Sequence, residues 1–85
     1  MKRTHDNFYL NENNKIIKDS FVAVANVISR KKFTSIADVG CATGAFPNYL
    51  KNRFPNCEIE GIEYLDNLLN KASADFPEIT FSKGN

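Results

Sequence analysis

The sequence predicts an α/β fold in which short parallel strands alternate with helices. A short apolar run, Ser35–Val39, leads into a turn that carries Gly40 and Gly44, and apolar residues at helical spacing follow this turn. A second apolar run then ends in an acid, Glu63. Alternating strand-like and helix-like segments are typical of strand-helix-strand units, which build parallel sheets.

A helix is expected before the first strand, over residues Asn11 to Lys31. Its apolar residues recur at helical spacing, and lysine, asparagine and aspartate fill its other face. A helix that binds a partner or a membrane surface is the alternative, but such helices carry a polar face rich in lysine and arginine rather than asparagine. The apolar stripe consists of Ile16, Ile17, Phe21, Val24, Val27 and Ile28.

The first strand, Ser35 to Val39, is short and apolar, which indicates an interior strand. The next helix should open at Thr43 or Gly44, because Pro47 fits only within the first turn of a helix, where its missing N–H costs nothing. The Phe-Pro-Asn sequence at 54–56 should end this helix.

The second strand is expected from Glu58 to Ile62. The helix that follows should be capped by Asp66, which lies between two leucines in the pattern of a hydrophobic staple, and should run to about Ala74. A Phe-Pro-Glu turn then leads into a third strand, from Ile79 to about Ser82.

Length and composition suit one small domain of an ordinary globular protein. The chain has 85 residues, of which 42% are hydrophobic and 25% charged, and its net charge of +1 gives no general attraction to nucleic acid. No apolar run approaches the ~20 residues that span a bilayer, and no signal-peptide core follows the amino terminus. Cys41 and Cys57 are expected at opposite edges of the sheet, too far apart for a disulfide, which indicates a reducing cytoplasmic compartment and no metal site.

The turn and the acid together form a layout that suits a nucleoside. A helix that follows a strand presents unpaired amide groups and its positive dipole end at the carboxyl edge of the sheet. At the tip of the next strand, Glu63 can accept hydrogen bonds from ribose hydroxyls. Asp38 lies inside the first strand, where a carboxylate without a donor would be costly, so it must find hydrogen-bond donors.

Three segments resemble the class I S-adenosylmethionine-dependent methyltransferases. Residues 37–44, Ala-Asp-Val-Gly-Cys-Ala-Thr-Gly, are similar to motif I of that family, in which an acid precedes a G-x-G-x-G turn. Residues 61–72 resemble its second strand, its ribose-binding acid and the helix after it, and residues 79–85 resemble its third strand. Ala42 replaces the middle glycine of motif I, and Asn85 replaces the acid that ends the third strand.

The resemblance implies a Rossmann-like three-layer methyltransferase fold, present here only in part. The family orders its strands 3-2-1-4-5-7-6, so a leading helix and a βαβαβ portion with the order 3-2-1 are expected. Residues 1–33 would form an amino-terminal segment whose helix packs on the sheet, and residues 34–85 the cofactor-binding portion. Groups that hold the methyl acceptor follow strand 4 in the family, so this chain alone, a truncated domain, is expected to be inactive.

The resemblance also implies S-adenosylmethionine as cofactor and assigns roles at its site. Asp38 would meet the amino group of the methionine part, Glu63 both ribose hydroxyls, Tyr64 the adenine ring and Asn85 the adenine amino group. His5 and Tyr9 are weaker candidates for the methionine end. No metal ligand is expected, and the catalytic residues are unknown. The expected cofactor-binding residues are Asp38, Gly40, Cys41, Ala42, Gly44, Glu63, Tyr64 and Asn85.

Two other functions remain open. A nicotinamide-dinucleotide domain would align its glycine fingerprint with Gly40, Ala42 and Ala45, but the middle position lacks the glycine that lets a pyrophosphate approach the backbone. A non-catalytic methyltransferase-like domain, used for assembly or regulation, is the second alternative. The methyl acceptor cannot be read from the sequence, although a small molecule is expected. The unpaired edge of the first strand predicts that the chain either forms a homo-oligomer, through this strand or a swapped amino-terminal helix, or folds only marginally.

Overall fold

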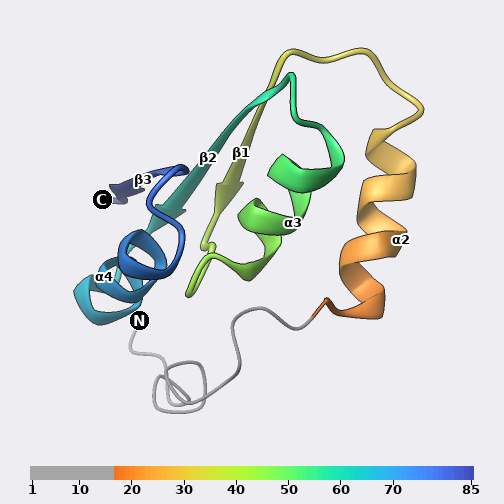
Figure 1. Cartoon of the computed structure of the whole chain (residues 1–85). Helices are drawn as coiled ribbons and strands as arrows, with labels where there is room; N and C mark the ends of the chain where they lie inside the picture. Colours follow the sequence, from red (N-terminus) through yellow and green to blue (C-terminus); the bar gives the residue numbers. More distant parts are fainter. Residues whose placement is uncertain (1–16) are drawn as a thin grey trace.

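The computed structural model describes residues 17–85, in which a leading helix is followed by three strands that alternate with two further helices (Figure 1). All three strands are parallel, and they lie in the order β1-β2-β3, so the predicted order 3-2-1 is confirmed. The elements are α2 (Asp19–Ile28), β1 (Ser35–Val39), α3 (Ala45–Arg53), β2 (Glu58–Glu63), α4 (Asp66–Asp75) and β3 (Thr80–Lys83).

The sheet pairs β2 with a neighbour on each side. Ser35 lies opposite Glu58 in the first pair of strands, and Glu60 lies opposite Thr80 in the second. As the expected order 3-2-1 implies, the first strand forms one edge of the sheet within residues 17–85, although its apolar composition suits an interior strand, and Val39 is 61% exposed. That part of the chain contains no strand to cover it.

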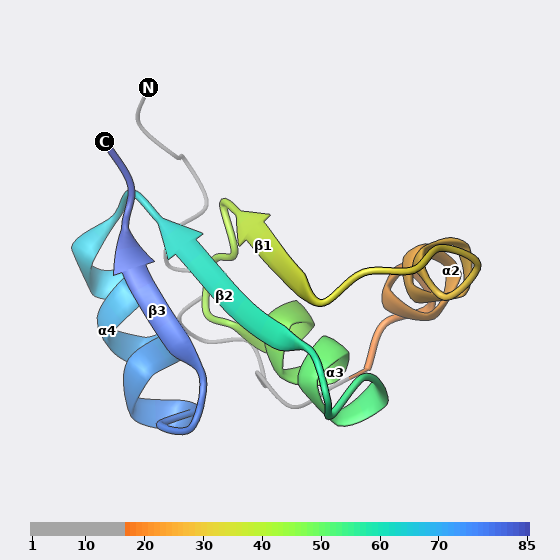
Figure 2. The same cartoon turned by 90° about the horizontal axis from the view of Figure 1, so that it is seen from above.

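Helices α3 and α4 lie on the same face of the sheet (Figure 2). Strand-helix-strand connections are almost always right-handed, so two successive connections that add strands in one direction place their helices on one side. The described residues therefore form two of the three layers of a Rossmann-like fold. The other face carries alternate strand residues, which are Ser35, Ala37, Val39, Glu58, Glu60, Ile62, Thr80 and Ser82.

The leading helix is shorter than its pattern indicated and packs differently. The predicted stretch from residue 11 to 16 lies outside the described residues, Lys18 has an extended backbone, and the helix ends at Ile28, where tighter turns begin. Ala25 is fully buried, whereas Val24 and Val27 are 46% and 56% exposed. The helix packs mainly against α3 and reaches the sheet only where Ala25 meets Ile59 of β2, so it buries a narrower stripe than the spacing predicts (Figure 1).

Other element boundaries moved by one residue, and one predicted cap was wrong. Leu65, not Asp66, is the residue that precedes α4, and no side chain caps this helix. Asp66 is its first residue instead, and its carboxylate forms an ion pair of 2.8 Å with Lys83. The amide of Leu65 donates a hydrogen bond to the carboxylate of Glu63, and this bond fixes the start of the helix from a residue that precedes it.

The apolar core lies between the helices and the covered face of the sheet. Leu50 of α3 and Ile59 of β2 are buried around Ala25, with the ring of Phe54 packed beside them. Leu68 of α4 belongs to the residues buried at the other end of the sheet. This packing fixes α3 and α4 against the strands, and so it fixes the loops at the strand ends.

Close packing at Gly61 yields a first prediction. A Cβ atom at this position would lie 2.6 and 2.7 Å from ring carbons of Phe81 and 2.9 Å from the sulfur of Cys41. Gly61→Ala should therefore lower the free energy of unfolding by about 1–3 kcal/mol, the usual cost of overpacking a core. Urea denaturation of the variant and the wild type measures the difference.

Ala37→Val is the matched control, because Ala37 is exposed on the open face of the neighbouring strand. Its added methyl groups meet solvent, and valine suits a strand, so stability should not fall. Equal stability of Gly61→Ala and the wild type would contradict the packing described for this strand.

Candidate functional site

The carboxyl ends of the three strands bring most of the predicted site residues to one edge of the sheet (Figure 2). The glycine turn follows β1, Tyr64 follows β2 and Asn85 follows β3. Two amides of the turn, those of Gly40 and Cys41, donate to the carbonyl of Ile62 at 2.7 and 3.1 Å. The turn is therefore fixed directly to the middle strand.

The turn uses left-handed backbone at every second residue. Gly40 has φ 77°, Ala42 has φ 53° and Gly44 has φ 90°. A left-handed residue with a side chain costs roughly 1–2 kcal/mol, whereas glycine has no such cost. The G-x-G-x-G spacing of motif I thus matches a conformational need at each of its three positions, and Ala42 meets that need under strain. The sequence alone predicts only that Ala42 leaves less space for a ligand than a glycine would.

Glu63 holds this edge together. Its side chain is fully buried. One carboxylate oxygen accepts the amide of Ala42 at 2.8 Å, and the other accepts the amides of Tyr64 and Leu65 at 2.8 and 3.0 Å. The residue expected to bind ribose therefore also ties the glycine turn to the loop between β2 and α4.

The number of bonds to Glu63 limits how it can meet a ligand. An ionised carboxylate has about four positions at which it accepts hydrogen bonds, and backbone amides use three of them. A ribose diol offers two donors, so at least one amide must be released before both hydroxyls can bond to Glu63. Binding of both ribose hydroxyls by Glu63 stays a prediction, and it requires that Glu63 first release at least one of these amides.

Asp38 contributes a carboxylate to the lining of the site. It is half-buried, and none of the hydrogen bonds or ion pairs among residues 17–85 involves its side chain. Within this part of the chain it therefore lacks the hydrogen-bond donors that a carboxylate inside a strand requires. Burial, and after it the negative charge of Glu63, raise the pKa of Asp38 above its ordinary value of 3.8.

The remaining predicted residues differ in their surroundings. Tyr64 is 45% exposed, and its ring lies against Gly84, where an added Cβ would be 2.6 Å from a ring carbon. Asn85 is exposed beyond β3. Cys41 is buried, and its sulfur packs towards Gly61, which favours the packing role over a reactive thiol. Both Cys41 and Cys57 are free cysteines.

A pocket of about 180 Å³ opens at the glycine turn and includes residues that the sequence did not single out for the site. Asp38 and the turn form one side of it. Lys18, Phe21 and Phe46 form another side, the first two from the segment that begins α2. Sequence reasoning placed Phe21 and Phe46 in the core by their helical spacing, and it gave no signal for Lys18.

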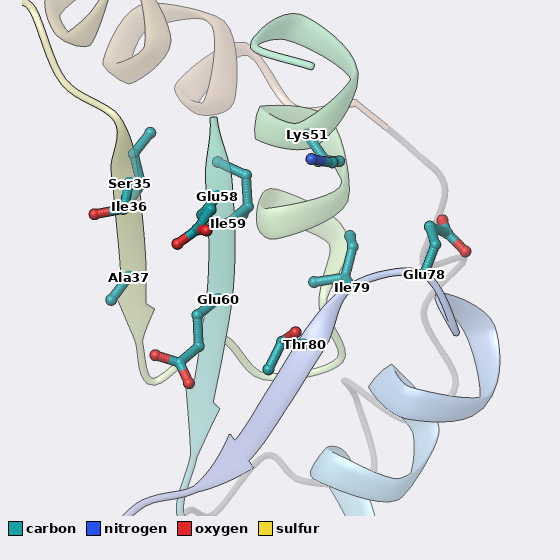
Figure 3. A pocket seen from close by; sticks show the side chains of 10 residues that line it. All are labelled: Ser35, Ile36, Ala37, Lys51, Glu58, Ile59, Glu60, Glu78, Ile79 and Thr80. Atoms are coloured by element: carbon teal, nitrogen blue, oxygen red, sulfur yellow. The ribbon is translucent and has the colours of Figure 1, made fainter. Parts of the chain in front are cut away.

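A larger hollow, of about 550 Å³, lies at the amino ends of the same strands (Figure 3). Its lining includes the exposed Glu58 and Glu78 and the half-buried Glu60, which accepts a hydrogen bond of 3.2 Å from Ser82. Lys51, also in the lining, donates to the carbonyls of Pro55 and Cys57. Parallel α/β sheets bind ligands at their carboxyl ends, so this hollow is the weaker candidate.

Residues 17–85 show no sign of a metal site or of a membrane span. This part of the chain contains no group of three or more histidine, cysteine, aspartate or glutamate residues that could hold a metal ion. None of its helices is both long and apolar enough to cross a membrane.

The raised pKa of Asp38 yields a prediction for stability. Since the folded state binds the proton of Asp38 more strongly than the unfolded state, this residue stabilises the fold below about pH 3.8, and that contribution is lost as pH rises through the raised pKa. Asp38→Asn removes the charge, so it should increase the free energy of unfolding at neutral pH. Below pH 3.8 the difference between variant and wild type should shrink.

Urea denaturation between pH 3 and 7 tests this, with Glu58→Gln as a control that changes an exposed acid at the other end of the sheet. A stability difference for Asp38→Asn that does not vary with pH would contradict the raised pKa.

The fold, with the carboxyl edge of its sheet, can be compared with known proteins. No protein-family model matches the sequence, and no curated protein matches it significantly. Solved structures do match. The SAM-bound amino pentose methyltransferase CalS10 of Micromonospora echinaspora, involved in calicheamicin biosynthesis, superposes with a TM-score of 0.71 and 26% identity, over 100% of this chain and 36% of that chain.

Two further structures show the same likeness. DesVI of Streptomyces venezuelae gives a TM-score of 0.66 with 22% identity, over 100% of this chain and 37% of its own. A TehB-like SAM-dependent methyltransferase from Corynebacterium glutamicum gives 0.61 with 23% identity, over 76% of this chain and 34% of its own. The chain thus spans about a third of the length of these neighbours. Residues 17–85 have the fold of the class I S-adenosylmethionine-dependent methyltransferases, in the part that comprises its first three strands.

Proposed function

We propose that this chain binds S-adenosylmethionine at the carboxyl edge of its sheet and forms the cofactor-holding part of a methyltransferase. The hydrogen bond between Glu63 and the amide of Ala42 carries this proposal, because it sets the ribose acceptor directly beside the glycine turn. The likeness to the SAM-bound structure of CalS10 supports it. Cofactor-binding roles fall to Asp38, Gly40, Cys41, Ala42, Gly44, Glu63, Tyr64 and Asn85.

Each of these roles follows from the position of a group at the edge. The turn offers exposed bare backbone at Gly40, where a ligand can approach closely, and Gly44 lets the end of the turn pack against the ring of Phe81. Asp38 offers a carboxylate to a cationic group, and Tyr64 offers an exposed ring to a flat base. Asn85 can accept from an amino group and donate to a ring nitrogen.

When bound, the cofactor supplies an activated methyl group for in-line displacement by a nucleophile. Such a step gains much of its rate from positioning, and this chain contributes the residues that hold and orient the cofactor. We assign no catalytic residue within the chain. A small-molecule acceptor is the proposed substrate class, and the amino pentose methyltransferase among the neighbours supports it. The two free cysteines support work in a reducing compartment such as the cytoplasm.

The alternatives to this function have less support. Ala42 has a methyl group on the strained turn where a dinucleotide needs bare backbone, which disfavours NAD. A non-catalytic domain that assembles with another part is compatible with the same fold. The division into residues 1–33 and 34–85 remains part of the proposal.

Glu63 gives the decisive test of cofactor binding. Glu63→Gln keeps the size of the side chain but loses the charge, so it should weaken binding of S-adenosylhomocysteine by about 1.5–3 kcal/mol, the size of charge-assisted hydrogen bonds. Titration calorimetry measures the affinity, and Glu58→Gln at the opposite end of β2 is the matched control.

Two ligands that differ only in their ribose hydroxyls distinguish a loss of ribose binding from damage to the loops that Glu63 holds. The wild type should prefer S-adenosylhomocysteine to its 2′,3′-dideoxy analogue, and Glu63→Gln should lose most of that preference. NAD should bind far more weakly than either. Stabilisation of the wild type by NAD alone, or failure to bind S-adenosylhomocysteine, would overturn the proposed function.

The open edge of β1 predicts self-association of the 85-residue chain. Among residues 17–85 no strand pairs with the backbone groups of β1 that face away from β2, and Val39 beside them is 61% exposed. Unpaired apolar edges attract other strands, and lysine on an edge prevents this. We expect sedimentation velocity at increasing concentration to show oligomers, fewer of them for Val39→Lys, and no change for Val27→Lys on α2.

A monomer at every concentration would rule this association out. We also expect the isolated chain to transfer no methyl group in a radiolabel assay, because it supplies cofactor contacts and no assigned acceptor site. Turnover by the isolated chain would show that the acceptor binds within these residues.

A further inference from the structure

The ring of Tyr64 lies against the backbone of Gly84, at the point where β3 ends. A Cβ atom on Gly84 would be 2.6, 2.8 and 2.9 Å from three adjacent carbons of that ring. Nearly equal distances to three adjacent carbons place this position above a face of the ring, because a position beyond the ring edge would be clearly nearer to one carbon than to its neighbours. Gly84 therefore covers part of one face of the Tyr64 ring.

Both partners of this contact are fixed to Glu63 through different groups. The amide of Gly84 donates to the backbone carbonyl of Glu63 at 2.9 Å, and the amide of Tyr64 donates to its carboxylate at 2.8 Å. The ring therefore has a fixed backbone at its own residue and a fixed surface behind it. Tyr64 is nevertheless 45% exposed, which leaves ring surface open beside the residue expected to bind ribose.

This contact requires glycine for its lack of a side chain and not for its backbone conformation. Gly84 has no positive φ, so alanine can adopt the same backbone without strain. The added methyl group would collide with the Tyr64 ring. Because Tyr64 is half-exposed, its ring can swing aside, whereas a methyl group on Gly61 meets the sulfur of the buried Cys41. A side chain at position 84 should therefore move the ring and leave the fold intact.

From this contact we propose that Gly84 is a positioning residue for recognition of the ligand's base and acts through Tyr64. Its bare backbone supports one face of the ring, and so it sets the plane on which a flat base stacks from the open side. Stacking depends on parallel overlap of the two ring systems, so a ring that has turned away binds the base less well. This inference rests on the proposed function and deepens it.

The ring contact can be tested without a ligand by nuclear magnetic resonance. Protons above the face of an aromatic ring are shifted upfield, so the α-protons of Gly84 should resonate upfield of ordinary glycine positions. Tyr64→Leu should abolish this shift, and Thr80→Ala, at the exposed start of the same strand, should keep it. Ordinary α-proton positions in the wild type would overturn the inference, whether or not the chain binds a nucleoside.

Titration calorimetry with S-adenosylhomocysteine tests the role in binding. Gly84→Ala should weaken binding about tenfold, within the range for loss of a stacked aromatic ring. The same substitution in a Tyr64→Ala background should have no further effect, because the ring that it displaces is already absent. Thr80→Ala is again the control and should bind as the wild type does. Gly84→Ala should keep a cooperative thermal melt close to that of the wild type.

The outcomes separate this inference from the proposed function. If Gly84→Ala binds S-adenosylhomocysteine as the wild type does, the positioning role is wrong and the proposed function stands. If the losses from Gly84→Ala and Tyr64→Ala add in the double variant, Gly84 acts without the ring, which also overturns the role. Loss of the cooperative melt in Gly84→Ala would contradict it too, because the ring would then not swing aside. If the wild type does not bind the ligand, the proposed function and the positioning role fail together.

Discussion

A single buried carboxylate sets the geometry of the edge at which this chain would work. Glu63 bonds to one amide of the glycine turn and to two amides of the loop that starts α4. Hydrogen bonds to a charged group are roughly twice as strong as neutral ones, so these contacts stabilise both loops and join them to each other. The positions of the turn, of Tyr64 and of the α4 entry all depend on this side chain.

The same interaction explains how a strained turn can persist. Ala42 adopts a left-handed backbone that costs free energy, and its amide is the one that Glu63 accepts. Strained positions last only where their surroundings hold them, and here the fixed amides of Gly40 and Cys41 lie on the other side. A ligand that draws Glu63 away from Ala42 would therefore also loosen the turn, so ligand binding and turn geometry are coupled.

Much of the fold could be predicted because its signals are local. The apolar runs and their glycine and proline punctuation located all three strands to within one residue, and the spacing of Gly40 and Glu63 located the edge. Tertiary contacts decided what the pattern missed. Helix α2 contacts only part of α3, so Ala25 is the residue of its apolar side that is buried in the core. The same contact places Lys18 in the lining of the pocket at the glycine turn. Asp66 does not cap α4, because Leu65 is the residue that precedes the helix and its amide donates to the carboxylate of Glu63.

Among the described residues, acidic side chains protect the sheet face that α3 and α4 leave uncovered, whereas the outer edge of β1 has no such protection. Glu60 lies on this face of the middle strand, bonded to Ser82 and near the exposed Glu58. Stacking two copies face to face would press carboxylates of like charge together and strip them of water, which is costly. These acids thus serve as gatekeepers against sheet stacking, as charged residues do beside unavoidable apolar strands. For the proposed self-association, these charges favour a sideways extension of the sheet, which would grow a ribbon and not a stack.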